Sequence, residues 1–134
     1  MKILMVLMSF DIGGAETHVL ELSRALAGMG HDITVASNGG VYVAELEKCG
    51  IKHVKLPLDR KNPLAFSRSY MGLSRLIKRE LFHVVHAHAR IPAFICGLLS
   101  RRLHFRFVTS AHWVFKANTL WRKISDWGEK TIAV

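Results

Sequence analysis

Residues 2–37 constrain the fold of this chain more than any other stretch. An apolar run over residues 3–8 breaks at residues 11–14 (Asp-Ile-Gly-Gly), and a segment with helical spacing of apolar residues leads to a second apolar run over residues 33–36. A strand, a glycine turn, a helix and a second strand form the opening unit of a doubly wound α/β fold. Ligands of such folds bind at the carboxyl ends of the strands, which is where the double glycine is predicted to lie.

The same alternation continues along the rest of the chain. Further strands are predicted over residues 52–56, 83–87, 106–109 and 131–134, and helices over residues 15–29, 43–48, 63–81, 92–103 and 117–127. The predicted fold class is α/β: a Rossmann-like three-layer domain with a mostly parallel sheet of about six strands and helices on both faces. Residues 1–134 are expected to form one domain, because this length suits a single domain with a sizeable core.

Charge and cysteine usage narrow the partners and the compartment. The chain has 19 basic and 10 acidic residues, a formal net charge of +9, which favours nucleic acid, a phosphorylated ligand or an acidic membrane surface unless a missing part of the protein balances it. No apolar run is long enough to span a bilayer, and no signal-peptide cleavage site follows the first residues. Cys49 and Cys96 lack metal-ligand spacing and are interpreted as buried thiols of a cytoplasmic protein.

The double glycine, Gly13 and Gly14, has two interpretations. Glycine permits positive φ and lets a ligand approach the main chain, and the free N–H groups of the next helical turn favour a phosphate or another anion. The alternative is a tight strand-to-helix turn that binds nothing. The spacing is not that of the dinucleotide fingerprint, which needs a third glycine in its own register.

Two histidines, His86 and His88, lie two residues apart on a predicted strand, so both imidazoles are expected on the same face. His88 is expected at the carboxyl end of the strand, where it could hydrogen-bond a hydroxyl or support charge in a transition state. A buried histidine satisfied by its neighbours is the alternative, and it fits His86 better than His88. No nearby Asp or Glu completes a metal-ligand set, so no metal is predicted.

The next strand also leads into a polar loop at this edge of the sheet. Thr109, Ser110 and His112 could bind a polyhydroxy ligand, or they could form an ordinary polar loop. Ser110 with a histidine would also fit a hydrolase, but no nucleophile-elbow pattern surrounds it.

Basic residues gather on the helix predicted after Pro63. Arg68, Arg75 and Arg79 lie seven and four residues apart and therefore share one helix face, with Lys78 adjacent. Basic and aromatic residues near the end of the chain add to this surface, which suits a membrane interface or stacked bases, with a solvated helix face as the alternative. The aromatic residues concerned are Trp113, Phe115, Trp121 and Trp127.

Taken together, these residues resemble the N-terminal domain of glycosyltransferase family 4, retaining enzymes of the GT-B fold. Residues 13–16, 30–35, 84–88, 108–112 and 131–134 carry the resemblance, which covers nearly the whole chain. Enzymes of this family have two Rossmann-like domains that face a cleft, and the N-terminal domain mainly holds the acceptor while the C-terminal domain holds the nucleotide-sugar. The resemblance implies no cofactor in this chain, a UDP- or GDP-sugar as the co-substrate of the full enzyme, and no metal ion.

The resemblance also implies roles for the residues singled out above. The loop with Gly13, Gly14 and Glu16 would approach the donor diphosphate and the acceptor, and His88 would be the catalytic histidine that contacts the transferred sugar. The acceptor-binding residues would be Arg90, Thr109 and His112, and the membrane-facing basic residues would be Arg68, Arg75, Lys78 and Arg79.

The predicted function is acceptor binding in a metal-independent hexosyltransferase that acts on a lipid-linked or cell-surface glycan. The C-terminal domain is absent here, so the isolated chain is expected to be inactive: a cut chain, a truncated gene or one subunit of a split transferase. We expect a cytoplasmic location with peripheral attachment to the inner face of the cell membrane, and no nucleic acid as partner. The alternative is a stand-alone flavodoxin-like module that binds a phosphorylated ligand or nucleic acid.

Overall fold

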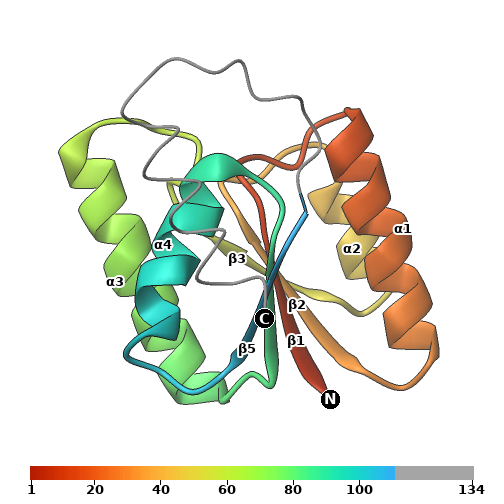
Figure 1. The fold of residues 1–134 in the computed structure, drawn as a ribbon. Coiled ribbons are helices and arrows are strands. Elements are labelled where there is room, and N and C mark those ends of the chain that lie inside the picture. Colours follow the sequence, from red (N-terminus) through yellow and green to blue (C-terminus); the bar gives the residue numbers. More distant parts are fainter. Residues whose placement is uncertain (111–134) are drawn as a thin grey trace.

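The computed structural model describes residues 1–110, in which strands and helices alternate along the chain (Figure 1). These elements agree with the predicted ones apart from small differences at their ends. The helix predicted over residues 117–127 and the sixth strand predicted over residues 131–134 lie outside the described residues. The strands are β1 (Lys2–Val6), β2 (Asp32–Ser37), β3 (Lys52–Lys55), β4 (Val84–Ala87) and β5 (Arg106–Thr109), and the helices are α1 (Gly14–Gly28), α2 (Val43–Lys48), α3 (Pro63–Glu80) and α4 (Arg90–Ser100).

The five strands form one parallel sheet in the order β3-β2-β1-β4-β5. Parallel neighbours need a crossover connection, and helices supply it here. The order reverses direction between β1 and β4, which is the switch point where Rossmann folds bind ligands. A flavodoxin-like sheet would place β1 between β2 and β3, whereas β1 here pairs with β2 and β4. The flavodoxin-like alternative is therefore wrong in its topology.

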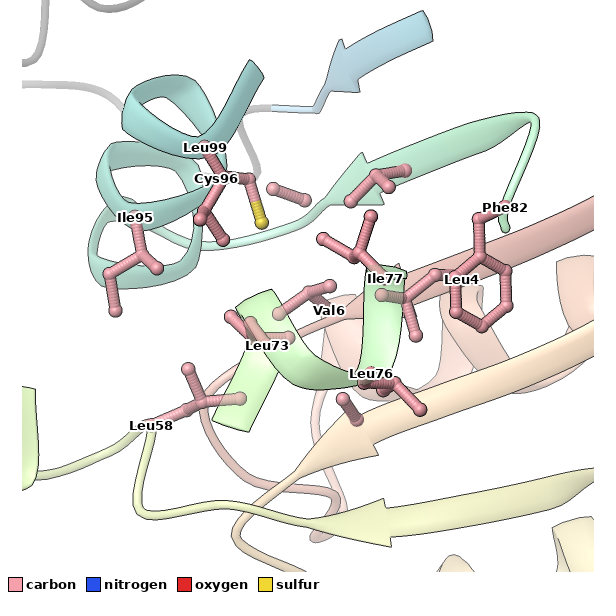
Figure 2. Close-up of a cluster of buried hydrophobic side chains, with 13 residues drawn as sticks. Leu4, Val6, Leu58, Leu73, Leu76, Ile77, Phe82, Ile95, Cys96 and Leu99 are labelled. Carbon is pink, nitrogen blue, oxygen red and sulfur yellow. The ribbon is translucent and has the colours of Figure 1, made fainter. Parts of the chain in front are cut away.

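The core lies on both faces of the sheet. Alternate side chains of β1 point in opposite directions, so Leu4 and Val6 pack toward α3 and α4 while Ile3 and Met5 pack toward α1 and α2. Burial on both faces explains why β1 is a continuous apolar run rather than an alternating one. Figure 2 shows the first of these clusters, to which α3 and α4 contribute Leu73, Leu76, Ile77, Ile95, Cys96 and Leu99.

Three residues at helix ends differ from the predicted burial. Met29 and Leu81, which end two predicted helices and continue their apolar spacing, are 72% and 74% exposed, and Cys49, expected to be buried, is exposed. All three are C-caps, of α1, α3 and α2 respectively, and Leu81 has a left-handed φ of 54°. Once the chain leaves helical geometry, the four-residue spacing no longer directs a side chain to the buried face. Cys96, inside α4, is buried as predicted.

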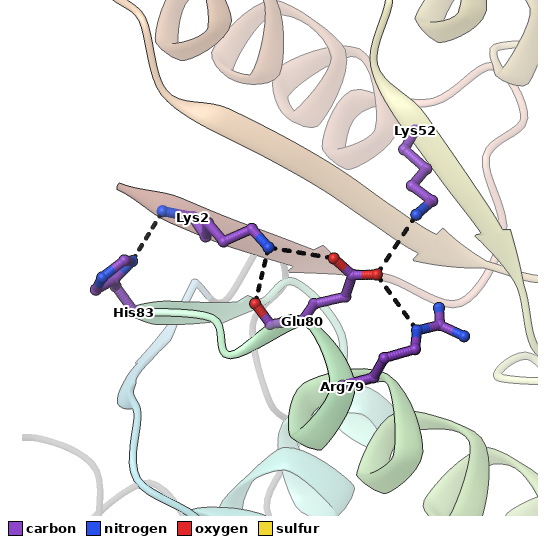
Figure 3. A network of polar contacts seen from close by, with 5 residues as sticks. All are labelled: Lys2, Lys52, Arg79, Glu80 and His83. Carbon is purple, nitrogen blue, oxygen red and sulfur yellow. Dashed lines mark hydrogen bonds and ion pairs between the residues drawn. The ribbon is translucent and has the colours of Figure 1, made fainter.

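The amino edge of the sheet carries a cluster of paired charges around Glu80 (Figure 3). The Glu80 carboxylate lies 3.2 Å from Lys2 Nζ, 3.5 Å from Lys52 Nζ and 3.3 Å from Arg79 Nε. The hydrogen bond from Lys2, followed by the charge of Lys52, lowers the pKa of Glu80. The Lys2 backbone N–H also donates to His83 Nδ1 at 2.9 Å. The cluster thus joins the starts of β1 and β3 to the end of α3 and the approach to β4.

Candidate functional site

Two loops pair with each other at the carboxyl edge and fix the turn that follows β1. The Asn38 N–H donates to Met8 O at 2.9 Å, Phe10 N–H to Gly39 O at 2.9 Å, and Tyr42 N–H to Phe10 O at 3.0 Å. Phe10 is fully buried, and its ring meets the Tyr42 ring edge-on at a centroid distance of 5.5 Å. The chain entering the double glycine is therefore held by backbone hydrogen bonds and by a buried aromatic anchor.

Gly40 makes this close packing of the two loops feasible. Its φ is +153°, and an added Cβ would lie 2.6 Å from Asp11 N and even closer to the Phe10 carbonyl. In the sequence, residues 39–40 only mark the end of the second apolar run, which does not indicate this role. A second double glycine, directly after a strand that leads to the ligand-binding edge, was the signal that could have found it.

The backbone at the double glycine does not use the positive φ that glycine permits. Gly13 is the N-cap of α1 with an extended backbone (φ −175°, ψ 171°), and Gly14 is the first helical residue. A Cβ at Gly14 would meet no atom within 4 Å. Among residues 1–110 no side chain caps α1, so its first N–H groups face the carboxyl edge. What glycine supplies at this place is an open approach to the main chain.

Glu16 lies in the first turn of α1 and folds back over Gly13, where its carboxylate is the group that a Cβ on Gly13 would meet. The helix dipole favours a carboxylate at this end. Thr17 fixes the same turn, because its hydroxyl donates to Gly13 O at 2.7 Å and lies 3.1 Å from Tyr42 Oη. An anion that binds this helix end must therefore displace the Glu16 side chain or bind beside it.

The two histidines of β4 lie on the same face, as predicted. Val85 and Ala87 belong to the core cluster under α3 and α4, so the alternate residues His86 and His88 face the α1 side of the sheet. Their rings are 3.9 Å apart between centroids, with an interplanar angle of 36°. The imidazoles thus form a tilted stack at the carboxyl end of the strand.

The more deeply buried of the two is His88, contrary to the prediction. His88 is 1% exposed, and its N–H donates to Val6 O at 2.9 Å, which extends the β1–β4 pairing one residue beyond β4. Its ring also lies 6.2 Å from the His18 ring on α1. His86 is partly exposed, and its Nε2 lies 2.8 Å from Ser110 Oγ. His88 therefore sits between α1 and β4 at the switch point, the place at which the fold binds ligands.

The predicted acceptor residues that the structure describes lie at this edge too. Only His88 and Ala89 separate β4 from α4, so Arg90 is the first residue of that helix. Thr109 is the last residue of β5 and pairs in register with Ala87 of β4. His112, which was predicted with them, lies outside the described residues.

The basic residues of α3 are exposed, but they do not gather at one place. A separation of 11 residues puts Arg68 and Arg79 about 16 Å apart along the helix axis. Arg68 lies near the carboxyl edge, whereas Arg79 pairs with Glu80 at the amino edge. Arg75 and Lys78 lie between Arg68 and Arg79 along the helix.

Two features are absent from the described part of the chain. Residues 1–110 contain no group of three or more His, Cys, Asp or Glu side chains that could hold a metal ion. None of the four helices α1–α4 is long and apolar enough to cross a membrane.

Comparisons with known proteins agree with this geometry. The family model described as Glycosyltransferase Family 4 matches residues 12–134, whereas no curated protein matches the sequence. One similar solved structure is a glycosyltransferase from Rickettsia africae, with 24% identity and a TM-score of 0.75; the match covers 90% of this chain and 32% of that one. HepE of Anabaena in complex with UDP has 14% identity and a TM-score of 0.78, covering 98% of this chain and 36% of HepE. MurG of Acinetobacter baumannii has 15% identity and a TM-score of 0.71, covering 97% of this chain and 39% of MurG.

At these identities the structural similarity establishes the fold alone, and the chain spans between 32% and 39% of the length of the three structures. The family match identifies the family, which the fold alone does not. It begins at Ile12, directly before the double glycine, and runs through His88 to the last residue. The chain belongs to glycosyltransferase family 4 and has the fold of the N-terminal domain of a GT-B enzyme.

Proposed function

We propose that this chain is the acceptor-binding N-terminal domain of a retaining, metal-independent glycosyltransferase. The full enzyme transfers a sugar from a nucleotide-sugar to a lipid-linked or cell-surface glycan. One observation carries the proposal: in a chain of this family, the open N-terminus of α1 and the buried His88 meet at the switch point between β1 and β4. A second domain, in cis or as a separate subunit, holds the nucleotide.

The α1 turn is suited to the leaving diphosphate of the donor, a UDP- or GDP-sugar. Main-chain N–H groups at a helix start stabilise negative charge, and Gly14 carries no side chain of its own to shield them, so only the mobile Glu16 side chain has to give way. These main-chain N–H groups can stabilise the charge of the diphosphate, as a metal ion does in other transferases. When the diphosphate binds, the carboxylate of Glu16 moves off the helix end and can accept hydrogen bonds from sugar hydroxyls.

His88 is suited to contact the transferred sugar. Its ring is shielded from water and stacked on His86, which Ser110 orients in turn through the 2.8 Å contact. A hydrogen bond made in such a dry, oriented site is stronger than one made in water. Arg90 and Thr109, at the same edge, bind acceptor groups beside the reacting centre.

The transferase activity can be tested with and without the second domain. The isolated chain, incubated with UDP- and GDP-sugars and candidate acceptors, should give no turnover, whereas a polypeptide that adds a second Rossmann-like domain after Val134 should. In that longer protein His88→Ala should lower kcat by about 100-fold or more, the size found when an electrostatic donor is removed from an active site. His104→Ala is the matched control, since His104 is exposed at the amino edge.

Three results would contradict the proposal. They are turnover by the isolated chain, product with inverted anomeric configuration by NMR, and loss of activity on addition of a chelator.

The exposed face of α3 has side chains that suit attachment of the protein to the inner surface of the cell membrane. Leu64 and Met71 are 63% and 50% exposed, and at helical spacing they share this face with Arg68, Arg75 and Lys78. Apolar residues flanked by cations suit an anionic lipid surface. The chain should therefore sediment with vesicles that contain anionic lipid, and less so at high salt. Binding that ignores lipid charge and salt would count against this attachment.

A further inference from the structure

The carboxyl edge has a second feature that the proposed roles of Gly14 and His88 do not use. A recess of about 420 Å³ lies beyond the ends of β2 and β3, beside the start of α3. Its polar lining consists of Asn38, Lys55, Arg60, Asn62 and Arg68. A volume of this size falls within the range of small-molecule sites.

The fold brings these side chains together from three elements. Lys55 ends β3 in register with Ser37, and the chain then turns through a loop anchored by Leu58, which is fully buried. Asn62 closes the loop as N-cap of α3, because its Oδ1 accepts a hydrogen bond from Ala65 N at 2.8 Å. Arg60 is thus carried on a loop fixed at both ends, and Arg68 extends from the second turn of α3.

The charge of this recess is one-sided. Lys55, Arg60 and Arg68 line it together with no carboxylate, and within residues 1–110 none of these three forms an ion pair. Three like charges in one recess repel one another, and the N-terminal end of the α3 dipole adds further positive potential. A bound anion would remove this repulsion.

We propose that the recess binds a phosphate ester group. Phosphate offers only acceptor oxygens at neutral pH, which matches a lining of three cations and two amides that can each donate N–H. The assignment of this phosphate to the glycosyl acceptor rests on the proposed function. Leu64, which also lines the recess and is largely exposed, contacts the organic part of the ester.

The proposal assigns Arg68 to the phosphate ester, whereas Arg75 and Lys78 on the same helix do not line the recess. Arg75 lies two turns further along the helix, is exposed, and is not part of the lining. A general attraction of anions to the basic helix would depend on Arg68 and Arg75 alike. A site in the recess depends on Arg68 alone, so Arg75 provides a matched control.

The test is calorimetric titration of the 134-residue chain with glycerol 3-phosphate, with glycerol as the neutral probe. We expect binding of the phosphate ester and none of glycerol. Arg60→Gln and Arg68→Gln should each weaken binding about tenfold or more, and Arg75→Gln should leave it within twofold. Far-UV circular dichroism checks that the variants are folded. Absence of binding, or equal weakening by Arg75→Gln, would overturn the proposal.

The phosphate ester can belong to a soluble molecule or to a lipid headgroup, and vesicles distinguish the two sources. If it is a headgroup, phosphatidylglycerol vesicles bind the chain, Arg68→Gln weakens that binding more than Arg75→Gln, and glycerol 3-phosphate competes. If it is soluble, glycerol 3-phosphate binding is unchanged when vesicles are added. Displacement of glycerol 3-phosphate by a single-stranded oligonucleotide but not by other phosphate esters would count against the assignment.

Kinetics of the two-domain enzyme separate this inference from the proposed function. If the chain binds glycerol 3-phosphate in the recess but the longer protein transfers no sugar, the proposed function fails and the phosphate site stands. If sugar is transferred to a phosphorylated acceptor with an unchanged KM in Arg60→Gln and Arg68→Gln, the assignment of the recess to the acceptor fails alone.

Discussion

The charged side chains at the amino edge of the sheet are paired, whereas the cations that line the recess at the carboxyl edge form no ion pair within residues 1–110. At the amino edge, Glu80 holds Lys2, Lys52 and Arg79 within 3.5 Å of its carboxylate. At the carboxyl edge, Lys55 and Arg68 line a recess, and neither forms an ion pair within residues 1–110. The helix α3 touches both, because it begins beside the recess and ends at Glu80. Paired charges hold strand and helix ends together, whereas uncompensated charges remain available to a ligand.

The same contrast separates the glycines and the histidines. Gly40 packs against backbone and therefore belongs to the framework, whereas Gly14 faces open space beside the helix start. His83 accepts a backbone hydrogen bond at the amino edge, while His88 is buried at the switch point. Residue type alone thus does not identify a framework residue: the packing around each glycine and the edge at which each histidine lies make the difference.

The largest expected effect on stability comes from Gly40→Ala. The added Cβ would collide with the Phe10 backbone, and the φ of +153° is strained for any residue with a side chain. Overpacking and strain together should destabilise the fold by about 2–5 kcal/mol. Urea unfolding with an unchanged m-value would measure it. Gly28→Ala is the control, since no atom lies within 4 Å there, and it should be neutral or slightly stabilising.

A smaller loss of stability is expected for Glu80→Gln, because the variant removes the shared partner of Lys2, Lys52 and Arg79. The pKa of Glu80 is lowered in the folded chain, so its contribution is present above about pH 4.5 and is lost as the pH falls through the folded value. The urea midpoints of wild type and variant should differ at pH 7 and converge on acidification. A constant difference at all pH values would mean that the ion pairs contribute nothing.

His53 should make a smaller contribution to the pH dependence of folding stability, at pH values near and below 6.5. Its Nε2 lies 2.7 Å from Ser37 Oγ, and burial lowers its pKa below the ordinary 6.5. The unfolded chain therefore takes up the proton first, and stability falls as the pH drops below about 6.5. His53→Gln should flatten this part of the stability curve. If wild type and variant keep parallel curves between pH 7 and 5, His53 is not the cause.

The smallest expected effect on stability is that of the recess variants. Arg60→Gln and Arg68→Gln remove cations that have no ion-pair partner within the described chain, so their thermal midpoints should equal that of wild type. Glu80→Gln should conversely leave glycerol 3-phosphate binding unchanged. A stabilised Arg68→Gln would indicate relief of repulsion in the recess and would strengthen the comparison. A destabilised one would show that this edge is also structural.

The sequence predicted the order and type of the elements of residues 1–110 well, because the longer helices show apolar residues at helical spacing and the strands are short apolar runs bounded by turn residues. The position of His88 followed from the end of its strand. Helix ends were less predictable, since Met29 and Leu81 continue an apolar spacing after the backbone has stopped being helical. The spacing of apolar residues predicts the buried face of a helix only as far as the backbone remains helical.

The sequence could not predict contacts between loops. Gly40 and Phe10 are far apart along the chain, and the role of each is visible only when the two loops lie side by side. The recess is a similar case, because Lys55 and Arg68 belong to different elements and Arg68 looked like part of a helix stripe. Glycine at the helix start was recognised, but its backbone conformation depends on how α1 meets β1.

The positions of the two cysteines, one at a helix end and one in the core, equip the chain for spectroscopy without any mutation. Cys49 is exposed at the end of α2, whereas Cys96 is buried in α4, where burial also raises the pKa of its thiol and suppresses the reactive thiolate. A maleimide dye should therefore attach at one position. Because Cys49 follows α2 just before the start of β3, it lies toward the amino edge of the sheet, and a dye there would leave the carboxyl edge unobstructed. Figure 1 shows α2 beside α1, on the face of the sheet opposite α3.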